Sequence, residues 1–261
     1  MAPLVDVRDL SFRYGHKQNW VLRSLNLSIE RGSAVGVVGE SGSGKSTLVR
    51  LLCGLLPVGS GSVTYDGRAV TDWLSKDPRQ FRLHNQMVFQ SPAASLDPRM
   101  RIRRSVAEPV RALERRKIGD DELESWLSMV GLGPEALNRY PHQFSGGQLQ
   151  RVAIARALSV SPTVLYADEP TSALDVSVQA QVLNLLMDLR ARLGLTLVIV
   201  SHDLAVVSRM CEHILVMRNG EIVESGPTVD VLHSPSSAYT NALTKAASAV
   251  SLRPGNVTSA G

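Results

Sequence analysis

The feature that most constrains this chain is a glycine-rich loop of the form G-x-x-x-x-G-K-[ST] at residues 39–47. It reads Gly39, Glu40, Ser41, Gly42, Ser43, Gly44, Lys45, Ser46, Thr47. Glycines in such a loop let backbone N–H groups approach phosphate oxygens, and the positive end of the following helix points at the same oxygens. We expect Lys45 to reach the β- and γ-phosphates of a nucleoside triphosphate, and the Ser46 hydroxyl to bind Mg²⁺.

The segments on either side of this loop are of the kind that the motif requires. Residues 34–38 form a short apolar run typical of a buried strand, and residues 48–54 are predicted to form a helix. The alternative is a chance glycine-rich turn, but a strand, a loop and a helix in this order favour phosphate binding.

Length and composition limit the possible architectures. With 261 residues, 44% of them apolar, the chain can form one large domain or a core with a smaller lobe. Cys53 and Cys211 lie far apart without metal-ligand spacing, so we expect both to be small, reduced core side chains. No apolar run reaches the roughly 18–20 residues needed to span a bilayer. Any role at a membrane would therefore need another polypeptide.

Polar side chains follow three predicted strands at the point where each strand ends. Gln90 ends the strand at residues 86–90, Asp168 and Glu169 end the strand that begins at residue 164, and His202 follows the strand at residues 195–200. In open α/β sheets ligands bind at the carboxyl ends of the strands. We therefore expect these four side chains to converge on one site.

Each of these side chains has a predicted role in hydrolysis of the triphosphate. Asp168 would hold Mg²⁺ through its water shell, and Glu169 would polarise the water that attacks the γ-phosphate. Gln90 could reach Mg²⁺ and the attacking water through its amide. His202 could contact the γ-phosphate and hold the water in line with Glu169. Taken alone, Gln90 is equally a surface residue at a strand end, and a single histidine there is usually structural.

A second anion site is predicted at residues 145–148. Ser145 is a good N-cap for a helix that continues to Leu158, and the N–H groups of Gly146 and Gly147 lie at its positive end. The alternative is a capped helix with a glycine-rich entry. Tyr14, on a loop before the phosphate-binding motif, could stack on a purine, although from its own segment a core tyrosine is the better interpretation.

Residues 99–130 are predicted to be helical and begin with a basic cluster. Such a cluster can bind nucleic acid or anionic lipid, but it is more often a solvated or partner-facing helix surface. No aromatic residues interleave with it, as base stacking would favour, so we expect no nucleic-acid partner. Residues 176–193 are predicted to form a long helix that contributes to the core, and the tail from residue 248 is predicted to be disordered.

Taken in order, these motifs resemble the ATP-binding subunits of ABC transporters over about residues 4–247. The resemblance is carried by residues 39–47, 90, 144–148, 164–169, 172–175 and 202. Phe144 stands where leucine is commoner. The resemblance implies an α/β fold: a P-loop NTPase (RecA-like) core with an N-terminal antiparallel β subdomain and an inserted α-helical subdomain at about residues 95–160. It implies one ATP-binding domain at residues 1–247, followed by the tail at 248–261.

The resemblance also implies how ATP and Mg²⁺ are bound. Family members form head-to-tail dimers, with ATP between the phosphate loop of one subunit and residues 145–148 of the other. The implied catalytic residues are Glu169, His202, Gln90 and Lys45, and the implied Mg²⁺ residues are Ser46, Gln90 and Asp168. The implied ATP-binding residues are Tyr14, Gly39, Ser41, Gly42, Gly44, Lys45, Ser46, Thr47, Gln90, Ser145, Gly146, Gly147, Gln148 and Asp175.

Within the family, residues 91–92 with 95–99, 140–144, 177–183, and 233–235 followed by 239–243 are most similar to the oligopeptide, dipeptide and nickel uptake branch. This similarity implies an ATP-hydrolysing importer subunit that powers uptake of peptides or of nickel and other metal chelates. The implied partners are a second ATPase subunit, the same or similar, two transmembrane permease subunits and an extracytoplasmic solute-binding protein. The implied location is the cytoplasmic face of the cell membrane. Many members of the branch carry a cysteine cluster in a longer tail; without one here, we expect no iron–sulfur site.

Three other functions are less well supported. A soluble ABC ATPase of nucleic-acid or ribosome processes usually joins two ATPase modules or carries long coiled-coil insertions, and this sequence has neither. An exporter subunit is disfavoured by the branch-level motifs. A GTPase switch lacks the Asn-Lys-x-Asp motif that reads the base, and it leaves residues 145–148 unexplained.

Overall fold

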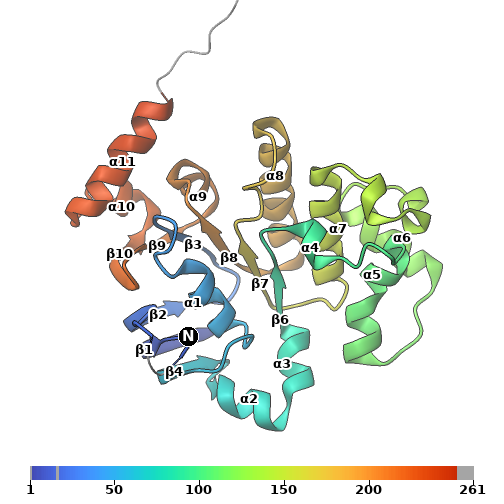
Figure 1. Ribbon diagram of the computed structural model, residues 1–261, viewed down its shortest axis with the longest axis horizontal. Coiled ribbons are helices and arrows are strands. Elements are labelled where there is room, and N and C mark those ends of the chain that lie inside the picture. The colour runs from blue at the N-terminus through green and yellow to red at the C-terminus, as the bar shows by residue number, and fades with distance from the viewer. Residues whose placement is uncertain (1, 16–17, 252–261) are drawn as a thin grey trace, which may run out of the picture.

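The computed structural model describes residues 2–15 and 18–251 and consists of two sheets with helices around them (Figure 1). The larger sheet has six strands in the order β10-β9-β3-β8-β7-β6. Their bounds are β3 Ala34–Val38, β6 Asn85–Val88, β7 Val164–Asp168, β8 Thr196–Ser201, β9 His213–Arg218 and β10 Glu221–Pro227. All neighbours pair in parallel except β10, which is antiparallel to β9. The carboxyl ends of five strands therefore meet at one edge.

The smaller sheet is antiparallel, with the order β2-β1-β4-β5. It consists of β1 Val5–Phe12, β2 Leu22–Ile29, β4 Ser60–Tyr65 and the short β5 Arg68–Ala69. Apolar residues of β1 and β2 alternate with exposed ones, because one face of this sheet is covered and the other is open to solvent. The predicted fold class, with an N-terminal antiparallel β subdomain, is confirmed.

Two apolar clusters fill the space on either side of the larger sheet. Along β8, Leu197 and Ile199 join one cluster, whereas Val198 and Val200 join the other. The first cluster includes residues of the helices α5 to α9, and the second includes α1 and the antiparallel sheet. Cys53 and Cys211 are buried and free, as expected, and burial raises the pKa of each thiol to about 12.

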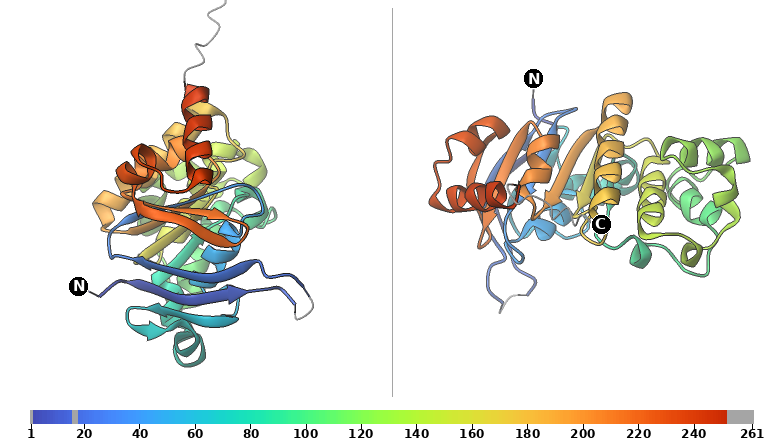
Figure 2. Two further views of the ribbon diagram at one scale, coloured as in Figure 1. Left: turned by 90° about the vertical axis from the view of Figure 1, so that its left-hand side faces the viewer. Right: turned by 90° about the horizontal axis from the view of Figure 1, so that it is seen from above.

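Helices follow or connect the strands, and several gather at one end of the molecule. Those near the smaller sheet and β6 are α1 Lys45–Leu52, α2 Val70–Lys76, α3 Pro78–His84 and α4 Pro92–Ser95. The group at the end opposite α10 and α11 comprises α5 Ile102–Pro109, α6 Asp120–Met129 and α7 Gly146–Leu158, with the single turns η1 Val110–Glu114, η2 Pro134–Asn138 and η3 Pro141–Gln143. Figures 1 and 2 show this group apart from the sheets, at the place predicted for the inserted helical subdomain.

The basic segment at residues 99–130 is not one continuous helix, contrary to the simplest interpretation of its sequence. A π-helical turn, η1, follows α5 directly, and Arg115 then adopts a left-handed backbone conformation with φ of 58°. A left-handed residue ends a right-handed helix. The next helix, α6, begins only at Asp120, where three acidic residues occupy its positive first turn.

The remaining helices are α8 Val176–Leu193, α9 Leu204–Met210, α10 Thr228–His233 and α11 Ala238–Ser251. The bounds of α8 agree with the predicted helix at residues 176–193. Helix α11 includes residues 248–251, the first four residues of the predicted tail, and the alanine-rich segment before them favours a helix. Residues 252–261, the rest of the predicted tail, lie outside the described residues.

Candidate nucleotide site

The phosphate loop follows β3 and leads directly into α1. Its Lys45 ammonium is buried and donates to the carbonyl oxygens of Gly39 and Glu40, both at 2.8 Å. A Cβ atom on Gly39 would lie 2.1 Å from the carbonyl oxygen of Met217, and one on Gly44 would lie 2.6 Å from the Leu22 side chain. Both positions therefore require glycine, in addition to their positive φ angles.

Ser46 and Asp168 meet at the base of the loop. The Ser46 hydroxyl donates to the Asp168 carboxylate at 2.8 Å, and the Arg50 guanidinium lies 3.8 Å from its other oxygen. Burial raises the pKa of the Asp168 carboxyl, and the hydrogen bond from Ser46 and the charge of Arg50 oppose that rise. Burial likewise lowers the pKa of Lys45, while Glu169 and Asp168 oppose that change. The site thus holds charged groups in a partly desolvated environment, as expected of a functional site.

Gln90 and His202 converge on one carboxylate oxygen of Glu169. The Gln90 amide donates to Oε2 of Glu169 at 3.2 Å, and Nδ1 of His202 lies 3.4 Å from the same oxygen. Glu169 has a left-handed backbone conformation, with φ of 45°. Such a conformation is costly for a residue with a side chain and is found preferentially at functional sites. It follows the end of β7, where the Glu169 N–H donates to the carbonyl of Val200 at 3.0 Å.

A cavity of about 520 Å³ lies at this edge of the sheet and joins the two groups. This volume is in the range of small-molecule sites. The cavity is lined by Val21, Ser41, Gly42, Gly44, Lys45, Ser46, Thr47, Gln90, Glu169 and His202. The structure therefore brings together the loop residues and the side chains that follow three separate strands, and Asp168 is joined to them through Ser46.

Tyr14 lies beside this cavity rather than in the core. Its hydroxyl is within 3.1 Å of the Thr47 hydroxyl, and its ring packs edge-on against Phe12 at 5.1 Å between centroids. About half of the side chain, 53%, is exposed. The ring is therefore fixed by two contacts and remains about half exposed, so part of it is available for stacking.

The structure does not bring residues 145–148 or Asp175 to the cavity of the same chain. Ser145 caps α7, accepting from the Gln148 N–H at 3.3 Å, while the Gln148 side chain accepts from the Ser145 N–H at 3.1 Å. Ser145 and Gly146 are exposed, and Gly147 packs so closely on α8 that a Cβ atom would lie 2.3 Å from Val178. Asp175 is exposed at the start of α8. These residues form a separate surface.

Three residues near the site are not identified by their sequence motifs. Arg50, which faces Asp168, lies four positions after Ser46, and this helical spacing is the one available signal. Gln179 donates to the carbonyl oxygens of Thr171 and Leu174 and so holds the segment after Glu169. Tyr239 contacts the phosphate loop from the far end of the chain, through a hydrogen bond with the Glu40 N–H.

We expect Asp168→Asn to stabilise the nucleotide-free protein by about 1 kcal/mol. Burial raises the pKa of Asp168 in the folded state. The contribution of this carboxyl group to the free energy of unfolding is therefore fully favourable only below its unfolded-state pKa, and it is lost as the pH rises through the folded-state pKa. At pH 7 the ionised carboxylate is therefore a net cost. Asparagine retains an acceptor for the Ser46 hydroxyl.

Thermal unfolding at pH 7 without nucleotide measures this change. Asp188→Asn is the control, because Asp188 is exposed and forms only a surface pair with Arg192, which contributes little to stability. A lower melting temperature for Asp168→Asn than for the unmodified chain would show that Arg50 and Lys45 more than compensate for the buried charge.

Comparisons with known proteins agree with this geometry. A family model described as ABC transporter matches residues 22–172. The oligopeptide transport ATP-binding protein OppF of Salmonella typhimurium is 42% identical over 258 residues, covering 93% of this chain and 77% of OppF. The di/tripeptide transport ATP-binding protein DppF of Pseudomonas aeruginosa is 44% identical over 261 residues, covering 96% of this chain and 80% of DppF.

Two solved structures are similar over most of their length. The structure of cbiO1 from Clostridium perfringens, part of the ABC transporter complex cbiONQ, superimposes with a TM-score of 0.79 at 28% identity and covers 90% of this chain and 92% of cbiO1. A dimeric, post-hydrolysis structure of the ATP-binding cassette MJ0796 bound to ADP and Pi has a TM-score of 0.74 at 31% identity, covering 86% of this chain and 98% of MJ0796.

Proposed function

Since this chain belongs to the ATP-binding subunits of ABC transporters, which hydrolyse ATP to drive transport, we propose that it powers the import of peptides through separate permease subunits. The observation that carries the ATPase role is the convergence of Lys45, Glu169 and His202 on one cavity. The peptide specificity rests on the similarity to OppF and DppF, which are named for oligopeptide and di/tripeptide transport.

Mg²⁺ fits the oxygen donors at the base of the site. Among the described residues no cluster of three or more His, Cys, Asp or Glu side chains could enclose a metal ion. Mg²⁺, however, usually keeps several waters and takes one or two protein oxygens together with substrate phosphates. The Ser46 hydroxyl, the Asp168 carboxylate and the Gln90 amide oxygen supply such donors. When bound, the ion would neutralise charge on the phosphates.

The side chains around Glu169 suit activation of a water molecule. Its carboxylate accepts from Gln90 and faces His202, and only 17% of the side chain is exposed, so its orientation is restricted. We assign Glu169 as the general base, with Gln90 and His202 holding it and the water in position. Lys45 and the loop N–H groups bind the phosphates and stabilise the charge that develops on them.

The exposed start of α7 is proposed to complete the site of a second subunit. Helix α7 has thirteen residues, a capped positive end, and exposed Ser145 and Gly146, which do not line the cavity of their own chain. In a head-to-tail dimer this end would close over the ATP bound by the other subunit. The dimer of MJ0796 shows that a similar cassette associates in pairs.

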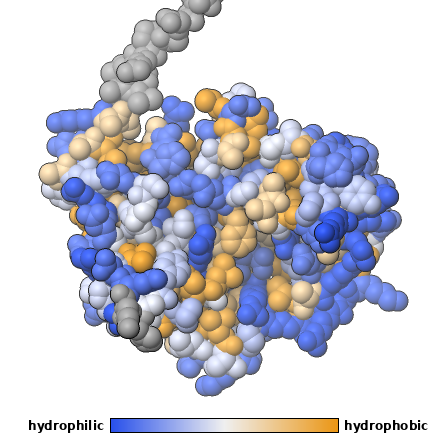
Figure 3. All heavy atoms as spheres, in the orientation of Figure 1, coloured by the Kyte–Doolittle hydropathy of each residue, from blue (hydrophilic) through white to orange (hydrophobic). Residues whose placement is uncertain are grey.

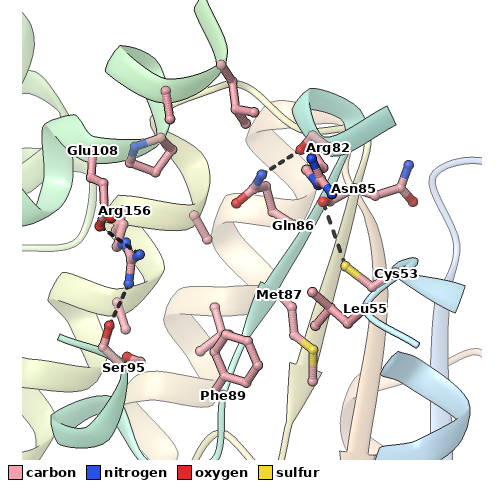
Figure 4. A pocket seen from close by; sticks show the side chains of 16 residues that line it. Cys53, Leu55, Arg82, Asn85, Gln86, Met87, Phe89, Ser95, Glu108 and Arg156 are labelled. Carbon is pink, nitrogen blue, oxygen red and sulfur yellow. Dashed lines mark hydrogen bonds and ion pairs between the residues drawn. The ribbon is translucent and has the colours of Figure 1, made fainter. Parts of the chain in front are cut away.

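A groove on one face is proposed to receive a helical segment of the permease. It has a volume of about 280 Å³ and lies between β6 and the helices α5 and α7. Figure 3 shows apolar side chains in the lower middle of this face, near β6 and α3, whereas the helices on the right are mainly hydrophilic. Figure 4 shows Phe89, Met87 and Leu55 on one side of the groove and Arg156, paired with Glu108, on the other.

The position of Phe89 argues for this occupant. Phe89 is 37% exposed and immediately precedes Gln90, which contacts Glu169. A partner that packs against Phe89 would therefore lie next to Gln90, which holds the proposed general base Glu169. No helix in the described part of the chain is long and apolar enough to cross a bilayer. From the similarity to OppF and DppF, we propose that the subunit lies against permease subunits at the cytoplasmic face of the membrane.

Reconstitution with candidate permease subunits and a solute-binding protein from the same organism tests the proposal. We expect ATP-dependent uptake of labelled peptides into vesicles, and no uptake of a nickel chelate under the same conditions. Phe89→Asp should abolish co-purification with the permease while leaving ATP binding unchanged, and the exposed Val229→Asp, on α10, is the matched control. Uptake of nickel alone, or retention of the permease by Phe89→Asp, would contradict the assigned solute or the assigned groove.

A further inference from the structure

Tyr239, on α11, joins the C-terminal part of the chain to the phosphate loop. Its hydroxyl accepts a hydrogen bond from the Glu40 N–H at 3.1 Å, across 199 positions of sequence. The side chain is only 9% exposed and packs in the apolar cluster that also contains Val207 and Met210 of α9. Neither Tyr239 nor Glu40 is among the residues that line the ATP cavity.

The bond to Tyr239 and a bond to Lys45 hold the same peptide group. The Gly39 carbonyl accepts from the Lys45 ammonium at 2.8 Å, and the Glu40 N–H belongs to the same planar unit as that carbonyl. Rotation of this peptide would break both hydrogen bonds at once. The Tyr239 hydroxyl therefore stabilises the carbonyl orientation that holds the Lys45 ammonium in place.

Tyr239 is itself fixed to the larger sheet. The Glu224 carboxylate, on β10, accepts from the N–H groups of Ser236 and Ser237 at 2.7 and 3.1 Å, just before α11. The Ser237 hydroxyl accepts from the Tyr239 N–H at 3.2 Å, and the Arg218 guanidinium lies 4.8 Å from the centre of the Tyr239 ring. Figure 1 shows α11 next to α10 and on the same side of the molecule as β9 and β10, at the end opposite the helices α5 to α7.

The hairpin of β9 and β10 also contacts the phosphate loop. The Gly220 N–H, in the turn between these strands, donates to the Ser43 carbonyl at 3.1 Å. The Met217 carbonyl, near the end of β9, lies so close to Gly39 that no side chain would fit there. The segment at residues 217–239 therefore contacts the phosphate loop both at Gly39–Glu40 and at Ser43.

We propose that Tyr239 is a positioning residue for ATP binding, which orients the Gly39–Glu40 peptide and through it the Lys45 ammonium. This inference rests on the proposed role of the loop as the ATP site. It gives the segment after β10 a function in the ATPase itself. Tyr239 makes no contact with the nucleotide in this scheme, so it should affect ATP affinity more than the chemical step.

Tyr239→Phe removes only the hydroxyl and tests this directly. We expect the Kd and the KM for ATP, measured with magnesium present, to rise roughly three- to tenfold, the effect of one lost hydrogen bond. The kcat at saturating ATP should stay within about twofold of the unmodified value. Glu224→Gln, which weakens the hold on Ser236 and Ser237, should raise the Kd in the same direction but less.

Tyr166→Phe is the matched control. Tyr166 is fully buried on β7, and its hydroxyl donates to the Asn85 side chain at 3.3 Å, away from the loop. This variant should lower the melting temperature and leave the Kd for ATP unchanged. An unchanged Kd for ATP in Tyr239→Phe, or an equal rise of that Kd in Tyr166→Phe, would overturn this inference but not the proposed function. Absence of ATP binding by the unmodified chain would overturn the proposed function as well.

Discussion

Glu169→Gln is expected to lower ATP turnover by roughly 10²- to 10⁴-fold, the usual contribution of a general base, with little change in nucleotide affinity. Glutamine has the same shape but cannot take a proton from water. The Gln90 amide can still donate to the side-chain oxygen, so the surroundings of residue 169 should be preserved. Phosphate release measures turnover, and equilibrium titration with a fluorescent ATP analogue measures affinity.

The exposed Glu124, on α6 and far from the cavity, provides the control substitution Glu124→Gln. It removes one carboxylate of the same kind and should leave both quantities unchanged. Because hydrolysis reopens the proposed dimer, Glu169→Gln should also accumulate ATP-bound dimers, detectable by their size in solution. Normal turnover in Glu169→Gln would remove Glu169 from the role of general base.

The convergence of Gln90, Asp168, Glu169 and His202 could be predicted because it depends on strand direction alone. Each residue follows or ends a strand, and strands joined by crossovers run in parallel, so their carboxyl ends meet. The sequence positions of the strands were sufficient for this, even though β6 ends at Val88, two residues before Gln90. The contacts of Gln90 and His202 with one oxygen of Glu169 required the structure.

Other features depend on contacts that leave no local pattern. The hydrogen bond between Tyr239 and Glu40 links distant segments, and neither residue belongs to a motif that specifies the other. The end of the helix after η1 could not be predicted either. Arginine is a good helix former, and its side chain does not indicate the left-handed conformation of Arg115. Tertiary packing decides both, and propensity does not.

The exposed start of α7 shows a different limit. A single chain leaves Ser145 and Gly146 without a ligand, so physical reasoning from the sequence finds an anion site but no anion. The proposed purpose of this anion site comes from the family resemblance, which implies a dimer in which the site contacts ATP bound to a second subunit. The geometry of one chain is consistent with that purpose because this helix end does not line its own cavity and remains accessible.

Lys45→Met should weaken ATP binding by about 2–4 kcal/mol, or roughly 30- to 1000-fold in Kd. Methionine keeps most of the length of the side chain but removes its charge, so phosphates bound in the loop would lose their buried cationic partner. Turnover at subsaturating ATP should fall by at least the same factor. This behaviour is the reverse of that of Glu169→Gln, in which affinity is retained and only turnover is lost.

Opposing effects should keep the nucleotide-free stability of Lys45→Met near that of the unmodified chain. The substitution removes a charge whose burial lowers its pKa, but it leaves the carbonyl oxygens of Gly39 and Glu40 without their donor. The exposed Lys117→Met, measured by the same titration and by thermal unfolding, controls for the loss of one positive charge. If Lys45→Met bound ATP as tightly as Lys117→Met, the buried ammonium could not be the group that recognises the phosphates, and the cavity beside it would need another ligand.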